Sequence, residues 1–370
     1  MRLKYGTTYI NTPLRAPMLR ARSARADRST DLPGLDAFLG GARRVAVVVA
    51  DATRATGIDR LMPALADRLR GRRATVVFAN GLHRPTRPDE RTRILGGVRL
   101  PTADHDARRG PGRALLGADR VIVTGTVGIH YLAGWGGGWK MIYPGCADER
   151  TILRLHRMTL QDGCEPGRLD GNPFRAAIDA LGERFPVPAF AVQTVLSANR
   201  RIVGVFCGDV LAAHRAAVAE ARRWHTVPIR ARVGRIVASA GGHPKDINLI
   251  QAHKAIVHAA HALRPGGELV MLAACPDGLG FPGFERWFDF RSPAALAAAL
   301  RRRFHVYGRT AWALWRNAAR FRIRIVSELP NALVERLRMT PASRPTGADL
   351  VLPDAGSVLP VLGRPEIRDS

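Results

Sequence analysis

Lysine is scarce in this chain of 370 residues, and its placement is the first chemical signal. Of the 57 side chains that are lysine or arginine, only four are lysine: Lys4, Lys140, Lys245 and Lys254. Arginine stays protonated, whereas a lysine amine can lose its proton and form a covalent bond. We therefore interpret Lys140, which ends the glycine-rich segment 134–140, as a candidate attachment point for a cofactor or substrate.

Three histidines accompany that lysine, namely His83, His130 and His156. A single loop histidine usually has a structural role. Three of them, grouped with Arg54 and Lys140 near the ends of predicted strands, indicate a site in which imidazoles act as general acids and bases or as metal ligands.

The glycine-rich segment does not match a phosphate-binding loop. That motif requires glycine before its lysine and serine or threonine after it, where this chain has Trp139 and Met141. A flexible loop with an incidental lysine remains the alternative, which the scarcity of lysine disfavours.

Short apolar runs must position these side chains. Residues 45–50, 74–78 and 121–123 predict buried parallel strands, and a helical pattern begins near Ile58. The polar candidates Arg54, His83 and His130 follow these strands. Ligands in such sheets bind beyond the carboxyl ends of the strands, so we expect these side chains to meet at one edge.

A second α/β unit begins near residue 230. We predict strands at 235–239 and 268–273, and between them a helix over 247–263 with Asp246 as its N-cap. On that helix Gln251, Lys254 and His258 share one face. His253 points elsewhere.

The predicted fold class is therefore α/β: two α/β domains with Rossmann-like parallel sheets and an active site in the cleft between them. The N-terminal domain is expected over residues 1–225 and the C-terminal domain over 226–370, with the best linker at 224–232.

Composition adds weaker constraints. The hydrophobic fraction of 46% and the charged fraction of 24% are typical of globular proteins. The formal charge of +26 comes from scattered arginines, and no aromatic and basic platform accompanies them, so we expect no nucleic-acid partner.

Four cysteines without a CxxC pair indicate a reducing compartment. Neither an apolar leader nor a run of about 20 apolar residues occurs, so we expect a cytoplasmic protein without a membrane partner.

Five segments resemble, in order, the motifs of the nickel-dependent lactate racemase family. They are DATR at 51–54, GLHRP at 81–85, HYLAGWGGGWK at 130–140, the stretch 144–156, and GGHPKDINLIQAHK at 241–254. The spacing from His130 through Lys140 to His156 is the most distinctive part of the match.

The resemblance implies a nickel pincer nucleotide, pyridinium-3,5-bisthiocarboxylic acid mononucleotide nickel. In this modified nicotinate nucleotide, nickel lies between sulfur atoms and a ring carbon. The family's tethering lysine matches Lys140, and its nickel-binding histidine matches His156. Imidazole is a suitable nickel ligand. We also expect Asp51 and Thr53 to contact the phosphate or ribose side of the cofactor, and cofactor-maturation enzymes to be partners.

The resemblance also implies a racemase or epimerase of a 2-hydroxy acid that works by hydride transfer. The acid and base histidines match His83 and His130. The residues that hold the substrate carboxylate match Arg54 and Lys254, with Gln251 beside the latter.

The chain departs from the family's pattern at Ala55, at Gly128-Ile129 and at Trp139. We expect Trp135 and Trp139 to add apolar bulk to the pocket wall, which would favour a substrate larger or more hydrophobic than lactate. Two alternatives stay open: a redox enzyme that uses the same cofactor, and a non-catalytic protein that binds the cofactor or an anion.

Overall fold

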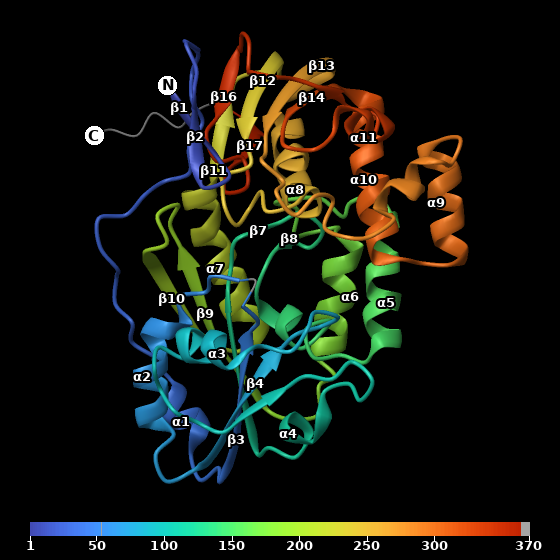
Figure 1. Ribbon diagram of the computed structural model, residues 1–370. Coiled ribbons are helices and arrows are strands. Elements are labelled where there is room, and N and C mark those ends of the chain that lie inside the picture. The colour runs from blue at the N-terminus through green and yellow to red at the C-terminus, as the bar shows by residue number, and fades with distance from the viewer. Residues whose placement is uncertain (53, 364–370) are drawn as a thin grey trace. The chain divides into compact units, whose positions relative to one another are not determined.

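The computed structural model describes residues 1–52 and 54–363 (Figure 1). Thr53, a predicted cofactor contact, lies outside the described residues. The chain forms two compact units: one is Arg22–Trp224, and the other combines Met1–Ala21 with the chain from His225 onward. Both are α/β units built on parallel strands, so the predicted fold class is confirmed.

The first unit is built on a six-stranded sheet with the order β10-β9-β6-β3-β4-β5. All neighbours are parallel except β10, which is antiparallel to β9. The strands are β3 (Arg44–Ala50), β4 (Arg73–Ala79), β5 (Thr102–Asp104), β6 (Arg120–Thr126), β9 (Ala189–Leu196) and β10 (Ile202–Gly208). The three predicted strands are thus β3, β4 and β6, each slightly longer than its apolar run.

Both faces of this sheet are covered. Along β3, Val45, Val47 and Val49 face one apolar cluster, whereas Ala46 and Val48 face the other, as strand periodicity requires. The first cluster includes α1 and α2, and the second includes residues of α4 to α7 (Figure 1). The helices are α1 (Leu35–Leu39), α2 (Ile58–Arg68), α3 (Pro88–Ile94), α4 (Gly112–Leu116), α5 (Glu149–Arg157), α6 (Pro173–Gly182) and α7 (Val210–His225).

Short elements fill the long connection between β6 and α6. They are β7 (Ile129–His130), β8 (Gly134–Trp135) and the 3-10 helices η1 (Gly138–Met141) and η2 (Met158–Leu160). This connection carries His130, Lys140 and His156.

The second unit has a parallel five-stranded sheet with the order β15-β14-β13-β12-β16. Its strands are β12 (Val233–Ser239), β13 (Leu263–Leu272), β14 (Arg322–Val326), β15 (Thr340–Pro341) and β16 (Leu350–Leu352). Its helices are α8 (Leu249–Ala259), η3 (Ala260–Ala262), η4 (Phe284–Phe288), α9 (Pro293–Arg302), α10 (Val306–Arg320) and α11 (Asn331–Arg336).

The N-terminal segment belongs to this second unit, which differs from the predicted division at residue 225. Leu3 and Leu14 are buried in one cluster with Val237 and Val270, because the hairpin of β1 (Arg2–Tyr5) and β2 (Thr8–Asn11) packs on this sheet. The predicted linker 224–232 is also ordered. It contains the end of α7 and β11 (Thr226–Ile229), which pairs in parallel with β17 (Leu359–Leu362).

The prediction that Asp246 caps the second-unit helix was wrong. Helix α8 begins at Leu249, and the Asn248 side chain caps it by accepting the Gln251 N–H at 2.9 Å. Asp246 is fully buried, and its Oδ2 accepts the backbone N–H groups of Gly6 (2.7 Å) and Ala274 (3.2 Å). Its carboxylate therefore ties the N-terminal hairpin to the sheet.

Within residues 1–52 and 54–363, none of the helices combines the length and the apolar character needed to span a bilayer.

Replacing Asp246 by alanine should leave two buried N–H groups without an acceptor and lower the free energy of unfolding by about 3 kcal/mol. Chemical denaturation of the full chain measures this loss. The matched control is Asp277→Ala, which removes an exposed carboxylate from a residue whose backbone N–H donates to the carbonyl of Ile247, the neighbour of Asp246, and it should change stability little. Equal stability of the two variants would contradict the assigned role of Asp246.

Candidate functional site

The predicted site residues of the first unit follow three neighbouring strands. Strand β3 lies between β6 and β4, and all three are parallel, so their carboxyl ends share one edge of the sheet. Asp51 directly follows β3, His83 follows β4, and His130 follows β6. The expectation that side chains on these loops converge at one edge is therefore supported by the strand order.

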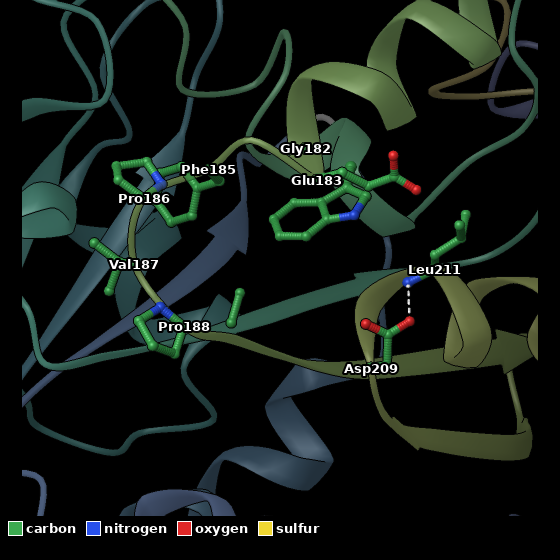
Figure 2. Close-up of a pocket in the computed structure, with 10 residues that line it drawn as sticks. Gly182, Glu183, Phe185, Pro186, Val187, Pro188, Asp209 and Leu211 are labelled. Carbon is green, nitrogen blue, oxygen red and sulfur yellow. Dashed lines mark hydrogen bonds between the residues drawn. The ribbon is translucent and has the colours of Figure 1, made fainter.

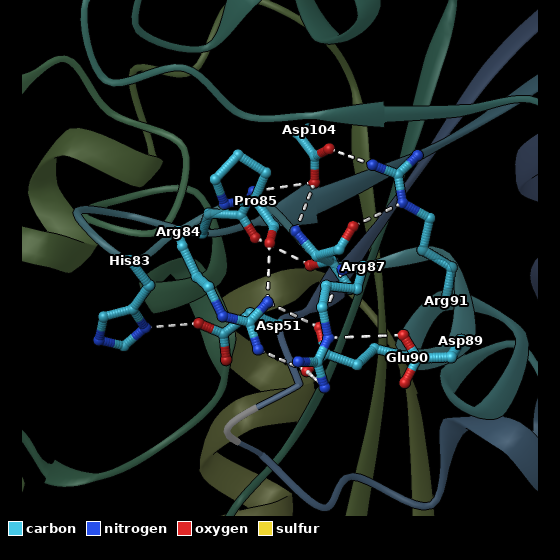
Figure 3. A network of polar contacts seen from close by, with 11 residues as sticks. Asp51, His83, Arg84, Pro85, Arg87, Asp89, Glu90, Arg91 and Asp104 are labelled. Atoms are coloured by element: carbon cyan, nitrogen blue, oxygen red, sulfur yellow. Dashed lines mark hydrogen bonds and ion pairs between the residues drawn. The ribbon is translucent and has the colours of Figure 1, made fainter.

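A hydrogen bond joins two of these loops. His83 Nδ1 lies 2.5 Å from Asp51 Oδ2, and the carboxylate is nearly buried while the imidazole is half exposed (Figure 3). A carboxylate can only accept a hydrogen bond, so the ring proton lies on Nδ1 and the basic nitrogen is Nε2. Asp51 thus orients His83 and fixes its tautomer.

A wider polar network holds the His83 loop (Figure 3). Arg84 forms a two-pronged pair with the buried Glu90 at 2.8 and 2.5 Å, and the Arg87 N–H donates to the same carboxylate at 2.9 Å. Hydrogen bonding from Arg84 and from the Arg87 backbone lowers the pKa of Glu90 to about 2. Asp104 accepts from Asn80 Nδ2 at 3.0 Å. The loop is therefore ordered around a carboxylate that stays ionised at neutral pH.

His130 is held in the opposite tautomer. Its Nδ1 accepts the backbone N–H groups of Leu132 (3.2 Å) and Ala133 (3.0 Å), so the proton of the neutral ring lies on Nε2. The ring also stacks on Tyr131, with centroids 5.4 Å apart. His83 therefore has a basic Nε2, whereas His130 has an Nε2–H that can donate.

The Lys140 segment lies over the same strand ends. Residue Met141 of η1 packs on Gly125 of β6, where an added Cβ would lie 3.2 Å from the Met141 side chain. The Gly81 N–H donates to the Gly145 carbonyl at 2.9 Å, which joins this segment to the His83 loop. Lys140 itself is half-buried. The structure thus brings the loops of His83, His130 and Lys140 to one edge.

The two tryptophans near Lys140 differ in their surroundings. Trp135 is fully buried, and its Nε1–H donates to the Gly167 carbonyl at 3.0 Å. Trp139 packs on Gly182 and stands 6.1 Å from the Phe185 ring. It lines a separate surface cavity of about 450 Å³ (Figure 2). The prediction that the indoles add apolar bulk to the wall of the substrate pocket was wrong for Trp135, because packing within the unit encloses its side chain. For Trp139 it stays a prediction.

His156 lies on α5, whose N-cap Asp148 accepts the Thr151 N–H at 2.8 Å. The Nδ1 atom of His156 lies 2.8 Å from the Ile152 carbonyl oxygen, so Nδ1 carries the proton and Nε2 is the nitrogen suited to a metal. Among the described residues, no three His, Cys, Asp or Glu side chains form a metal-binding group. The single donor identified at this position, His156 Nε2, suits a metal that is bound mainly by atoms of its own cofactor and takes one further nitrogen from the protein.

Two glycines at this edge leave room for such a group. A Cβ added to Gly81 or Gly128 would meet no atom within 4 Å. Open space beside bare backbone lets a ligand approach the chain closely. The residues present are thus compatible with a bound nucleotide-like cofactor at the loops of His83 and His130.

The predicted carboxylate-binding residues fall in both units. Arg54 is exposed just beyond β3 in the first unit. In the second unit Lys254 Nζ donates to Gln251 Oε1 at 2.6 Å, as their shared helix face predicts. His258 is buried, and its Nδ1 lies 2.8 Å from the Ala355 carbonyl. His253 is also buried. The roles assigned to Arg54, Gln251 and Lys254 stay predictions.

Sequence reasoning missed three buried polar residues beneath the Lys140 segment, namely Arg175, Gln193 and His214. Gln193 had a detectable signal, because it is the one amide in the apolar strand segment AFAVQTVL. Arg175 could not be distinguished from the many other arginines by sequence alone.

Comparison with known proteins identifies the family. The model of the lactate racemase N-terminal domain matches residues 25–111 and 112–166, and that of the lactate racemase C-terminal domain matches 230–348. Together these matches cover more than half of the chain. The protein belongs to the lactate racemase family.

Two curated family members are similar over part of their length. The lactate racemase of Thermoanaerobacterium thermosaccharolyticum is 26% identical over 273 residues, or 67% of this chain and 64% of that protein. The lactate racemase of Lactiplantibacillus plantarum is 27% identical over 277 residues, or 68% and 64%. The match thus spans somewhat less than two thirds of these relatives.

Solved structures support the fold. The lactate racemase apoprotein of T. thermosaccharolyticum matches with a TM-score of 0.86 over 97% of this chain and 99% of that chain, at 22% identity. A crystal structure of a Thermotoga maritima protein matches with a TM-score of 0.71 over 89% and 97%, at 17% identity. At these identities the likeness concerns the fold alone.

The opposite tautomers can be observed directly. At a pH where both rings are neutral, ¹H–¹⁵N correlation spectra of the imidazoles should show His83 protonated on Nδ1 and His130 on Nε2. Asp51→Asn removes the carboxylate and should change only the His83 signals, since His130 is held by backbone N–H groups. A His83 ring protonated on Nε2 in the unmodified protein would contradict the assignment.

Proposed function

We propose that this protein racemises or epimerises a 2-hydroxy acid of the lactate type. The observation that supports this most strongly is the pair of histidines on neighbouring strand ends, held in opposite tautomers by Asp51 and by backbone N–H groups. Membership of the lactate racemase family makes this chemistry the natural one for the pair.

Inversion at the carbinol carbon constrains the mechanism. A carboxylate stabilises an adjacent carbanion poorly, so direct removal of the carbon-bound proton is difficult. Transfer of that hydrogen as a hydride, with removal of the hydroxyl proton, passes through a neutral carbonyl instead. Two acid and base groups, one for each enantiomer, are then needed on opposite sides of the substrate.

The two histidines fit these roles. His83 Nε2 would accept the hydroxyl proton of one enantiomer, and the Asp51 carboxylate would stabilise the resulting imidazolium. On the other side of the substrate, His130 Nε2–H would donate a hydrogen bond to the substrate oxygen. To return a proton, His130 would first take one up to form its imidazolium, which releases Nδ1 from the two backbone N–H groups, and in the reverse direction the two histidines would exchange roles. Arg54 offers a planar fork for the substrate carboxylate, and Lys254 with Gln251 supplies a second cation and an amide.

We further propose that the protein uses a nickel pincer nucleotide tethered at Lys140. When bound, this group would supply a reversible hydride acceptor. His156 would add its Nε2 to the nickel. Asp51 and Thr53 are still proposed to contact the nucleotide, although Asp51 Oδ2 is hydrogen-bonded to His83. Cofactor-maturation enzymes would be the partners that this requires.

Covalent attachment can be tested by intact mass and nickel analysis of the full chain expressed with cofactor-maturation enzymes. We expect one adduct, which Lys140→Arg abolishes because a guanidinium cannot form the bond. Lys245→Arg is the matched control and should keep the adduct, since Lys245 is paired with Asp354 at 2.6 Å. His156→Ala should keep the adduct and retain less nickel. An unmodified Lys140 in the loaded preparation would refute the tether.

Hydride transfer predicts the fate of a label. A 2-hydroxy acid with deuterium on C2, racemised in ordinary water, should keep the deuterium in both enantiomers. His83→Asn and His130→Asn should each lower the rate by about 10²- to 10⁴-fold, whereas the exposed His243→Asn should not. Loss of deuterium to solvent would contradict the mechanism. A panel from lactate to larger 2-hydroxy acids, followed by chiral chromatography, would define the substrate.

A further inference from the structure

The backbone that leads to Lys140 is held by three side chains, which we call the loop clamp: Arg175, Gln193 and His214. Arg175 donates to the carbonyls of Trp135 (Nη2, 2.5 Å) and Gly137 (Nη1, 3.5 Å). His214 Nε2 lies 2.8 Å from the Gly136 carbonyl. Three consecutive carbonyls are therefore bound by two side chains.

Gln193 holds the next peptide. Its Oε1 accepts the Gly138 N–H at 2.8 Å, and its Nε2 donates to the Val123 carbonyl of β6 at 2.9 Å. Gln193 thus joins the loop to the central strands of the sheet. The clamp draws on β9, α6 and α7, so three separate elements hold a stretch of four residues.

The clamp places a cation in the interior. Arg175 is 2% exposed, and Asp179 is its ion-pair partner at 3.3 Å. Burial lowers the pKa of the Arg175 guanidinium and raises that of the Asp179 carboxyl. A charge removed from water is destabilising unless hydrogen bonds compensate for it, and here the loop carbonyls provide them.

His214 acts as a neutral donor. Burial, with a contribution from the Arg175 charge, lowers its pKa to about 3. A carbonyl oxygen can only accept, so the proton of this neutral ring lies on Nε2. The hydrogen bond to Gly136 therefore persists throughout the neutral pH range.

The glycines of the loop fit against the clamp. Gly137 and Gly138 have φ angles of 75° and 62°, and an added Cβ would lie 2.4 Å from Gln193 Oε1 or 2.9 Å from His214 Cγ. Lys140 follows two residues later in η1, where the preceding Trp139 packs on Gly182. The conformation of the loop is thus fixed up to the lysine.

We propose that Arg175, Gln193 and His214 are positioning residues that fix the main chain from which Lys140 projects, so that its amine needs no loop rearrangement to reach its covalent partner. The covalent partner rests on the function proposed above. The clamp itself does not, because its contacts lie within the protein.

Amine labelling of the cofactor-free full chain tests the clamp. A limiting acylating reagent, followed by peptide mass spectrometry, gives the labelling rate of Lys140 relative to the exposed Lys4 in the same molecule. Arg175→Ala and His214→Leu should change this ratio by roughly tenfold, because the loop is released. The matched control is Arg215→Ala, an exposed arginine next to His214, and it should keep the original ratio.

Two rescues separate positioning from general destabilisation. His214→Gln retains an N–H donor for the Gly136 carbonyl. Its ratio of Lys140 to Lys4 labelling should therefore return most of the way to that of the unmodified protein. A cavity of about 260 Å³ is lined by Arg175 and His214, so methylguanidinium can enter in place of the missing side chain. Added to Arg175→Ala, it should restore the labelling ratio in part. If Arg175→Ala does not fold, the comparison of His214→Leu with His214→Gln gives the same contrast.

Cofactor loading distinguishes the two proposals. If the unmodified chain forms a cofactor adduct, a smaller fraction of the molecules of each folded clamp variant should carry it. The Arg215→Ala variant should carry the adduct to the same extent as the unmodified chain. A changed labelling ratio without any adduct in the unmodified chain would refute the tether and leave the clamp supported. An unchanged ratio in folded Arg175→Ala and His214→Leu variants would overturn the clamp.

Discussion

The site of the first unit depends on the parallel pairing of β6, β3 and β4. In this register Ala50 of β3 lies opposite Ala79 of β4, and Val45 to Val48 of β3 lie opposite the start of β6. Parallel strands end at the same edge, so the loops that follow them must meet there. The apolar clusters on both faces keep this pairing fixed, which makes the edge a rigid base for the polar side chains.

Around this edge, backbone groups and buried polar side chains set the tautomers of His83 and His130 and the main-chain position of the Lys140 segment. A buried carboxylate fixes one imidazole, and two backbone N–H groups fix the other. The lysine segment is held from beneath by a guanidinium, an imidazole and an amide. Tautomer and main-chain position are therefore set by contacts within the protein itself, which is the kind of preorganisation that the proposed catalysis requires.

Much of the fold followed from local pattern. The runs at 45–50, 74–78 and 121–123 predicted β3, β4 and β6, because valine-rich segments of this length favour buried parallel strands. The helix cap near residue 248 was misplaced, because Asp246 and Asn248 are both good capping residues by type. Their difference arises from the contacts of Asp246 with Gly6 and Ala274, which are distant in sequence.

By itself, the sequence determined the family and selected the candidate site residues, because His83, His130, Lys140 and His156 stand in motifs that resemble those of the family. Only the tertiary structure decided what holds them. The Asp51 contact with His83 joins residues 32 apart, and the His214 contact with Gly136 joins residues 78 apart. It also decided that Trp135 belongs to the core, since its burial depends on neighbours from other elements. Such contacts arise from packing between distant segments, which local spacing does not encode.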